Sequence, residues 1–222
     1  MWILGIDDAG RGPVIGPMVL AGCLIDEETE RKFKLAGVKD SKQLTPKRRE
    51  DLAEKIKESA ETFEITLAYP DEIDGKNKNG INLNAVEAIK MAEIINRINK
   101  GFDKIKVIID CPSVNIEKWK DFLKTKINNL SNLEIVCEHK ADVNYIAVSA
   151  ASIIAKHIRE KEMDKLKEKF GTEIGSGYCS DPKTCKFLEN HMKEHSDKGI
   201  FRKTWGTWKE ACAISEQKKL FE

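Results

Sequence analysis

The hydrophobic pattern of this chain alternates between short apolar runs and longer stretches with helical spacing. Apolar runs bounded by Gly, Pro or charged residues predict strands at about residues 2–6, 18–25, 105–110 and 133–137, and alternation predicts one at 63–69. Because Gly and Pro separate the first two runs, we expect a tight turn and an antiparallel pair there.

Apolar residues at helical spacing predict helices at about residues 46–60, 82–100, 119–127, 142–170, 182–191 and 205–220. Thr45 and Pro46 suit an N-cap and the first helical position, while Gly101 and Gly171 suit helix ends. The polar segment 71–80 is expected to be a loop. Strands that alternate with helices indicate an α/β fold with a mixed sheet flanked by helices.

The composition changes after Gly171, where a glycine-rich segment precedes two predicted helices. We therefore expect residues 1–171 to form an α/β domain. Residues 172–222 are expected to form a small C-terminal helical appendage, because so short a segment cannot bury a full core alone.

Composition and charge argue against several classes of protein. The 222 residues contain no apolar run of about 18 residues, so we expect no membrane-spanning helix and no membrane partner. The N-terminus lacks the pattern of a secretory signal, and six cysteines show neither a CxxC pair nor zinc spacing. We expect reduced thiols in a cytoplasmic protein. The net charge of +1 means that a polyanionic substrate must be attracted by local groups.

Carboxylates mark the ends of two predicted strands. Asp7 and Asp8 follow the first apolar run, Asp110 closes the run at 105–110, and Asp142 begins a predicted helix. Taken singly, Asp7 and Asp8 better suit the cap of a turn, and Asp142 better suits a helix N-cap. If the strands are neighbours, the carboxylates meet at one sheet edge, where burial and mutual repulsion favour divalent cations. Two Mg²⁺ or Mn²⁺ ions about 4 Å apart would activate water at a phosphodiester.

Eight motifs occur in order along the chain: GIDDAGRGPVIGPMV, DSKQLTP, GIN, IID, KAD, SAASIIAK, GSGYCSDP and RKTW. Over about residues 3–208 the chain thereby resembles ribonuclease HII, particularly its archaeal branch. The resemblance implies an RNase H-like fold and an endonuclease that cleaves the RNA strand of RNA–DNA hybrids. It also implies cleavage on the 5′ side of single ribonucleotides embedded in duplex DNA, leaving 3′-hydroxyl and 5′-phosphate ends.

The resemblance assigns a metal site to four residues. The family's metal-binding carboxylate positions match Asp7, Asp8, Asp110 and Asp142, with two divalent ions, Mg²⁺ or Mn²⁺, as cofactors. Asp8 stands where the family has Glu, so its carboxylate reaches about 1 Å less far, and we expect weaker or metal-shifted activity. Cys179 also departs from the pattern, since the family usually has proline there.

The resemblance also implies substrate contacts. Gly10, Arg11 and Gly12 match the triplet that reads the RNA-to-DNA junction, and glycine lets the backbone approach a 2′-hydroxyl. Tyr178 matches the tyrosine that stacks on the sugar of the following deoxynucleotide. Without the resemblance, the triplet is equally compatible with an ordinary turn, and Tyr178 more often suits a packing role.

Four polar or basic residues are candidate phosphate contacts, although each alone also suits a solvated surface: Ser41, Lys42, Lys156 and Arg202. His191 and His195 have the i, i+4 spacing of a zinc-binding pair. With no third ligand evident, they indicate a solvated helix face.

Two other interpretations remain open. A phosphorelay receiver domain also places two acids after its first strand and another after a later strand. The long separation of Asp8 from Asp110 and the fourth acid, Asp142, argue against it. A noncatalytic or attenuated hybrid-binding protein, with its metal site weakened at Asp8, would bind without cleaving. Our main expectation is a monomeric enzyme that acts on RNA–DNA hybrids and on DNA duplexes containing ribonucleotides.

Overall fold

The computed structural model describes residues 1–39 and 44–220, the last five of these by backbone alone. It divides into two compact units, each assembled from several chain segments. Unit 1 comprises Met1–Ala9, Val19–Leu67 and Asn84–Ile158, and unit 2 comprises Gly10–Met18, Ala68–Leu83 and Arg159–Glu222. The expected division into residues 1–171 and 172–222 stays a prediction.

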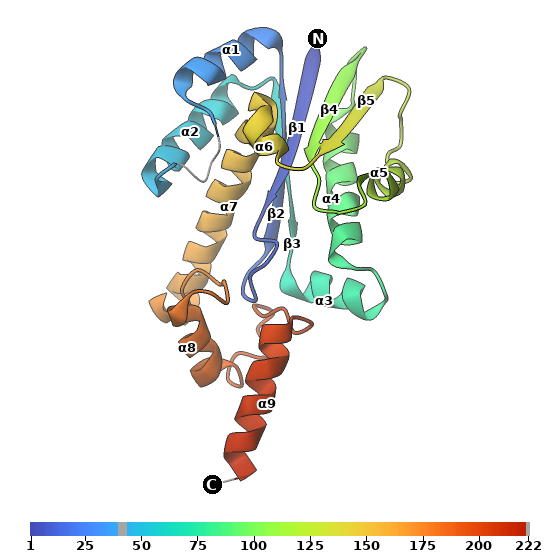
Figure 1. The fold of residues 1–222 in the computed structure, drawn as a ribbon. Coiled ribbons are helices and arrows are strands. Elements are labelled where there is room, and N and C mark those ends of the chain that lie inside the picture. The colour runs from blue at the N-terminus through green and yellow to red at the C-terminus, as the bar shows by residue number, and fades with distance from the viewer. Residues whose placement is uncertain (40–43, 221–222) are drawn as a thin grey trace. The chain divides into compact units, whose positions relative to one another are not determined.

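Unit 1 is built on a five-stranded mixed sheet with the strand order β3-β2-β1-β4-β5 (Figure 1). The strands are β1 (Trp2–Ala9), β2 (Met18–Ile25), β3 (Thr62–Ala68), β4 (Ile105–Asp110) and β5 (Leu133–Glu138). Strand β1 pairs antiparallel with β2 and parallel with β4, and β4 pairs parallel with β5. The predicted strands and the antiparallel pair are therefore confirmed. Strands β1 and β4, which carry the predicted aspartates, are neighbours.

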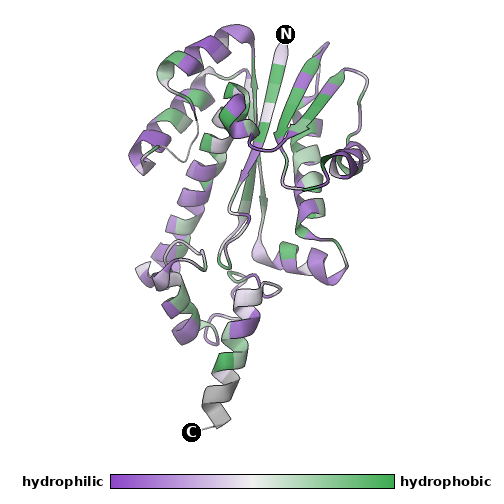
Figure 2. Ribbon diagram, viewed as in Figure 1, coloured by the Kyte–Doolittle hydropathy of each residue, from purple (hydrophilic) through white to green (hydrophobic). Residues whose placement is uncertain are grey.

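Helices cover both faces of this sheet. Successive strand residues point to opposite faces, and all eight residues of β2 are buried, so both faces of this strand must be covered. Ala21, Cys23 and Ile25 of β2 join a buried cluster with α1 (Glu27–Ala36), α2 (Pro46–Ser59) and the first part of α7 (Ile146–Phe170). Gly22, between them, faces Ile94 of α4 (Leu83–Ile98), and α5 (Ile116–Lys124) is tied to α4 by a hydrogen bond from Trp119. Figure 2 shows the strands of the sheet as largely hydrophobic and helices α1 and α2 as largely hydrophilic.

Two helices lie where the hydrophobic pattern did not predict them. Helix α1 has few apolar residues and buries only Phe33, and Asp26 caps it by accepting the N–H of Thr29 at 2.8 Å. The segment predicted as a polar loop is mostly helix α3 (Pro70–Lys78). Proline at its start and acids in its first turn favour the helix, although few of its residues are apolar.

The long helix predicted to begin at Asp142 is interrupted. A short helix α6 (Ala141–Asn144) is separated from α7 by Tyr145, whose backbone is extended at φ −127° and ψ 123°. Asp142 therefore lies inside α6, and Lys140, with a left-handed φ of 59°, precedes that helix. The kink was not predicted because the residues on either side have helical propensity.

Unit 2 contains α3, the end of α7, the short 3-10 helix η2 (Thr172–Ile174), α8 (Pro182–His191) and α9 (Gly206–Leu220). Its core combines Val14 and Ile15 with Phe187, Phe201 and Trp208, so distant chain segments share one apolar cluster. As expected, all six cysteines are free thiols. Among the described residues, no helix has both the length and the apolar composition needed to cross a membrane.

Candidate functional site

Three of the four predicted carboxylates come together in unit 1. In the parallel pair of β1 and β4, Ile6 lies opposite Ile109, so Asp7 and Asp110 follow at the same level of the sheet. Helix α6 supplies Asp142. One oxygen from each of the three carboxylates lies within 4.8 Å of the other two. The register of β1 and β4 therefore produces the convergence that their sequence pattern predicted.

The environment of Asp7 disfavours its ionised form. Asp7 is only 5% exposed, and burial raises its pKa well above the usual value. The negative charges of Asp8 and Asp110 raise it further. Hydrogen bonds from Ser152 and from the N–H of Asp8, at 2.7 Å, act in the opposite direction. Buried, mutually repelling oxygen ligands fit a divalent cation, which would stabilise their charge.

Hydrogen bonds that involve the backbone hold the elements carrying the other two carboxylates. The N–H of Ala141, at the start of α6, donates to Oδ1 of Asp110 at 3.3 Å, which ties β4 to α6. Ser149 of α7 donates its hydroxyl to the backbone carbonyl of Asp142 at 2.5 Å. Asp142 is buried and Asp110 half-buried. These contacts fix the elements that carry the two carboxylates.

Asp8 is not one of the three carboxylates that lie within 4.8 Å of one another. Successive residues of a strand point to opposite faces, so adjacent Asp7 and Asp8 do not share one direction within β1. Its backbone N–H nevertheless supports Asp7. The predicted role of Asp8 as a fourth metal ligand therefore stays a prediction.

In unit 2, Arg202 holds the loop that contains the glycine triplet. Arg202 has 0% exposure, and its guanidinium donates to the carbonyls of Gly10 at 2.6 Å, Arg11 at 2.7 Å and Gly16 at 3.0 Å. This corrects the expectation of a phosphate contact, because a side chain without accessible surface cannot meet a phosphate from outside. Its position instead shapes the backbone of the loop 10–17.

The rest of the RKTW motif makes the same loop part of a larger network within unit 2. Trp205 donates its indole N–H to the carbonyl of Gly12 at 3.1 Å. Asp74 of α3 accepts the N–H groups of Lys203 at 2.7 Å and Thr204 at 3.0 Å. Asp74 is buried, and these bonds satisfy its carboxylate. The motif is thus a structural clamp on the glycine triplet.

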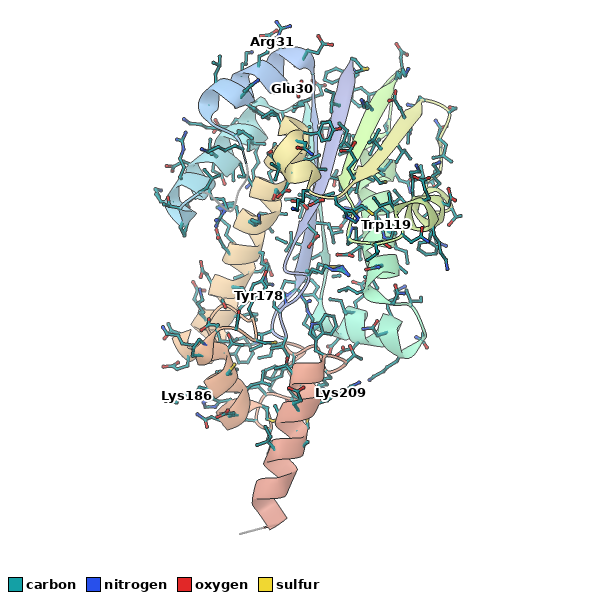
Figure 3. All side chains as sticks on the ribbon, viewed as in Figure 1. Glu30, Arg31, Trp119, Tyr178, Lys186 and Lys209 are labelled. Carbon is teal, nitrogen blue, oxygen red and sulfur yellow. The ribbon has the colours of Figure 1, made fainter. Side chains whose placement is uncertain are left out.

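Tyr178 lies next to this loop. It extends from the segment between α7 and α8 (Figure 3) and is 41% exposed. A Cβ built on Gly12 would lie 4.0 Å from Cε1 of Tyr178, so the ring and the triplet are neighbours. Behind the ring, the guanidinium carbon of Arg159 lies 5.6 Å from its centroid. The structure thereby brings together the two predicted elements of junction recognition.

The last predicted residues are three candidate phosphate contacts and the pair of histidines. Lys156 lies half-buried on α7, in unit 1, and its predicted phosphate contact stays a prediction. Ser41 and Lys42 lie outside the described residues. His191 and His195 do have a third potential ligand nearby, Glu194, which the sequence pattern did not reveal.

Two buried residues of this region were not predicted. Ser152 supports Asp7, and a signal existed, since a hydroxyl within the apolar SAAS run needs a hydrogen-bond partner when buried. Arg159 supports the loops around Tyr178. It carried no sequence signal, because its partners are backbone carbonyls and these have no characteristic side chain.

Comparisons with known proteins agree on one family. The family model for ribonuclease HII matches residues 4–208. Ribonuclease HII of Methanococcus maripaludis strain C7 is 46% identical over 223 residues, which cover 99% of this chain and 91% of that protein. The crystal structure of ribonuclease H2 from Pyrococcus horikoshii OT3 superposes with a TM-score of 0.85 at 39% identity, covering 99% of both chains. The RNase H-like fold is thereby confirmed.

A second solved structure includes a partner protein. The PCNA complex of ribonuclease HII from Archaeoglobus fulgidus matches with a TM-score of 0.80 at 38% identity, covering 92% of this chain and 95% of that one.

Proposed function

Because the chain belongs to the ribonuclease HII family of metal-dependent type 2 ribonuclease H nucleases, we propose that it cleaves the RNA strand of RNA–DNA hybrids. In our proposal it also cuts 5′ of single ribonucleotides in duplex DNA, leaving 3′-hydroxyl and 5′-phosphate ends. The observation that carries the proposal is the convergence of Asp7, Asp110 and Asp142 at neighbouring strand ends. Such a cluster suits hydrolysis of a phosphodiester with divalent cations.

The proposed cofactors are two Mg²⁺ or Mn²⁺ ions. Asp7, Asp110 and Asp142 would hold them, and Asp8 would complete the set. When bound, such ions stabilise negative charge on the phosphate and lower the pKa of the attacking water. The chain's own contribution is to hold oxygen ligands in fixed positions: Ser152 orients Asp7, and Ala141 orients Asp110.

Substrate recognition is assigned to the loop 10–17 and to Tyr178. Arg202 donates hydrogen bonds to the carbonyls of Gly10 and Arg11, which restrains the backbone that would meet a ribose. Gly12 has no Cβ to obstruct that approach. The exposed face of Tyr178 is suited to stack on the next sugar, where a second 2′-hydroxyl would interfere.

The deciding experiment uses a DNA duplex with one embedded ribonucleotide, incubated with Mg²⁺, Mn²⁺ or a chelator. We expect cleavage only with a divalent ion, with 3′-hydroxyl and 5′-phosphate ends, and no cleavage of an all-DNA duplex. The Asp110→Asn protein is the matched control. Cleavage that leaves cyclic phosphate ends, or cleavage unchanged by the chelator, would contradict the two-metal mechanism.

A noncatalytic or attenuated hybrid-binding protein is the second candidate, because Asp8 is not one of the three clustered carboxylates. Tight binding of the same duplex without cleavage in Mn²⁺ would favour it.

We also propose that the chain acts as a monomer in the cytoplasm and has no membrane partner. The PCNA complex of the Archaeoglobus relative makes a sliding clamp the protein partner to test. Gel filtration of the chain alone measures its oligomeric state, and gel filtration with a sliding clamp from the same organism measures whether the two proteins bind.

A further inference from the structure

Unit 2 carries a second cluster of potential metal ligands, at the end of α8. Nδ1 of His191 lies 3.2 Å from Oε2 of Glu194, and Nε2 of His195 lies 3.9 Å from the same oxygen. One ligand atom from each of the three side chains lies within 4.8 Å of the other two. All three residues lie within five positions of the chain, so one helical turn brings them together.

Backbone and packing orient the two imidazoles. The N–H of His195 donates to the carbonyl of His191 at 3.1 Å, which continues the helical turn past the end of α8. The ring planes differ by 13°, with centroids 5.8 Å apart. Phe187 packs against both rings at centroid distances of 5.0 and 5.9 Å, and Phe170 contacts His195 at 5.1 Å. This aromatic support limits the rotation of both rings.

We propose that His191, Glu194 and His195 form a binding site for a transition-metal dication of the zinc type. Two imidazoles and one carboxylate are a donor set that zinc favours, whereas Mg²⁺ prefers oxygen ligands alone. The ligand atoms of a tetrahedral zinc site are about 3.4 Å apart, so the three must approach one another slightly. The exposed Glu194 can do this by rotating, and its carboxylate is already hydrogen-bonded to His191. Water would supply the fourth ligand.

Such a site would stabilise unit 2 without taking part in cleavage. A ligand that binds only the folded state raises the unfolding temperature as its concentration increases. Zinc at this cluster would join α8 to the turn that follows it, since His191 ends the helix and Glu194 and His195 lie beyond it.

The test is calorimetric titration with ZnCl₂. An Asp7→Asn/Asp110→Asn protein serves as the background, because it lacks two carboxylates of the other cluster. We expect about one equivalent of zinc, as three protein ligands are sufficient for one ion. His191→Ala and His195→Ala should each weaken binding by about 10-fold or more, since even the loss of an outer-shell partner costs about 10–100-fold.

Glu189→Gln is the matched control, because Glu189 is an exposed acid on the same helix and is not a member of the cluster. It should leave zinc affinity unchanged, whereas Glu194→Gln should lower it. Zinc binding that persists in both histidine variants, or an absence of binding to the background protein, would overturn the site. Neither result depends on nuclease activity, so this proposal and the proposed function fail separately.

A different observation concerns Arg159, which joins the two segments assigned to substrate recognition. Arg159 is 5% exposed, and its guanidinium donates to the carbonyls of Ile15 and Pro17 in the loop 10–17. It also donates to the carbonyl of Ser176, two residues before Tyr178, at 3.3 Å. The ring of Tyr178 stacks on the same guanidinium. One buried side chain therefore fixes both segments.

Glycines make room for this arginine. A Cβ on Gly10 would lie 2.4 Å from Cδ of Arg159. Cβ atoms on Gly16 and Gly177 would lie 3.3 Å from its terminal nitrogens, and closer still to Sδ of Met163 and the carbonyl oxygen of Ile15, at 2.7 and 2.6 Å. All three glycines have positive φ values, between 82° and 85°. These glycines therefore permit both the positive φ values of the turns and the close contact with Arg159.

We infer that Arg159 is a positioning residue that sets the preference for an RNA-to-DNA junction by holding Tyr178 against the loop 10–17. This inference rests on the proposed function. Arg159 supports the buried side of the ring, so it acts through Tyr178. Arg159→Lys keeps the positive charge but loses the planar fork that reaches several carbonyls at once.

The test compares kcat/KM on a single-ribonucleotide duplex with kcat/KM on a continuous RNA–DNA hybrid. In Arg159→Lys and Arg159→Met we expect the ratio to fall by about 10- to 100-fold, as misplacement by about 1 Å can cost 10²-fold. Adding Tyr178→Ala to either variant should cause little further loss, because both changes remove the same interaction. Thermal unfolding verifies that each variant is folded.

Two outcomes separate the failure of this inference from failure of the proposed function. If the unmodified protein does not cleave either substrate, the proposed function fails. If it cleaves, and folded Arg159→Lys and Arg159→Met proteins keep the wild-type ratio while Tyr178→Ala loses it, the positioning role of Arg159 is wrong.

Discussion

The carboxylate cluster of unit 1 and the glycine-rich loop of unit 2 have opposite electrostatic character. In unit 1, Asp7 is buried near other negative charges, and its pKa is raised. In unit 2, buried Arg159 and Arg202 donate to backbone carbonyls of the loop 10–17, which contains no acidic residue. A buried charge with hydrogen-bond partners can stabilise a conformation, whereas clustered like charges oppose folding until a cation binds. We therefore expect substitutions in the two regions to affect activity and stability differently.

The largest effect is expected on activity in unit 1. Asp110→Asn removes one negative charge from the cluster and should lower the single-turnover cleavage rate by on the order of 10²-fold or more. Its free energy of unfolding in chelator should not decrease, because the substitution relieves repulsion with Asp7. Cleavage of the ribonucleotide duplex and urea unfolding measure the two quantities. A near-normal rate would remove Asp110 from the proposed mechanism.

The largest effect on stability is expected in unit 2. Arg202→Met leaves the buried carbonyls of Gly10, Arg11 and Gly16 without these donors, which should lower the free energy of unfolding by about 3 kcal/mol or more. Lys209→Met, an exposed position on α9, is the matched control and should change little (Figure 3). Equal stability of the two variants in urea would show that the clamp is energetically unimportant.

Two glycines sharpen the same comparison. A Cβ on Gly5 would lie 2.1 Å from the backbone of Ala147, so Gly5→Ala should destabilise unit 1 by about 1–3 kcal/mol or more. Among the described residues, a Cβ on Gly12 would meet only Cε1 of Tyr178, at 4.0 Å. Gly12→Ala should therefore fold normally and lose cleavage at single ribonucleotides. Thermal unfolding and cleavage assays on both variants measure this contrast. An equal loss of stability in Gly5→Ala and Gly12→Ala would contradict the expected contrast.

A smaller effect is expected at Asp8. Asp8→Glu restores the longer side chain of the family pattern, which extends the carboxylate by about 1 Å, so activity should rise or its metal preference change. Titrations of the cleavage rate with Mg²⁺ and Mn²⁺ measure both. Identical curves for the two proteins would refute the idea that the shorter acid weakens the site.

The smallest effect is expected in the pH dependence of stability in chelator. Because the pKa of Asp7 is raised above 3.8, the folded protein retains a proton that the unfolded chain has lost over the interval between these values. The contribution of Asp7 to the free energy of unfolding therefore falls as the pH rises through that interval. Asp7→Asn should reduce this slope. Urea unfolding at a series of pH values measures it, and an unchanged slope would show that Asp7 titrates normally.

The sequence by itself determined the strands, the order of most helices and the pairing of acids with strand ends. Hydrophobic periodicity encodes these features locally, and the register of β1 on β4 follows once both strands enter one sheet. The family resemblance also came from ordered motifs that are visible in the sequence alone. The prediction that Asp7 and Asp110 lie close together needed only one assumption, that their strands are adjacent in the sheet.

Tertiary structure decided what depends on contacts without a local sequence signature. The hydrophobic pattern missed α1 and α3 because caps and a few buried residues stabilise them. The role of Arg202 changed from a phosphate contact to a clamp because its partners are backbone carbonyls, which every residue possesses. Glu194 became a candidate ligand only when the turn after α8 brought it to His191. Periodicity reports which face a residue presents, whereas hydrogen-bond partners depend on how distant segments pack.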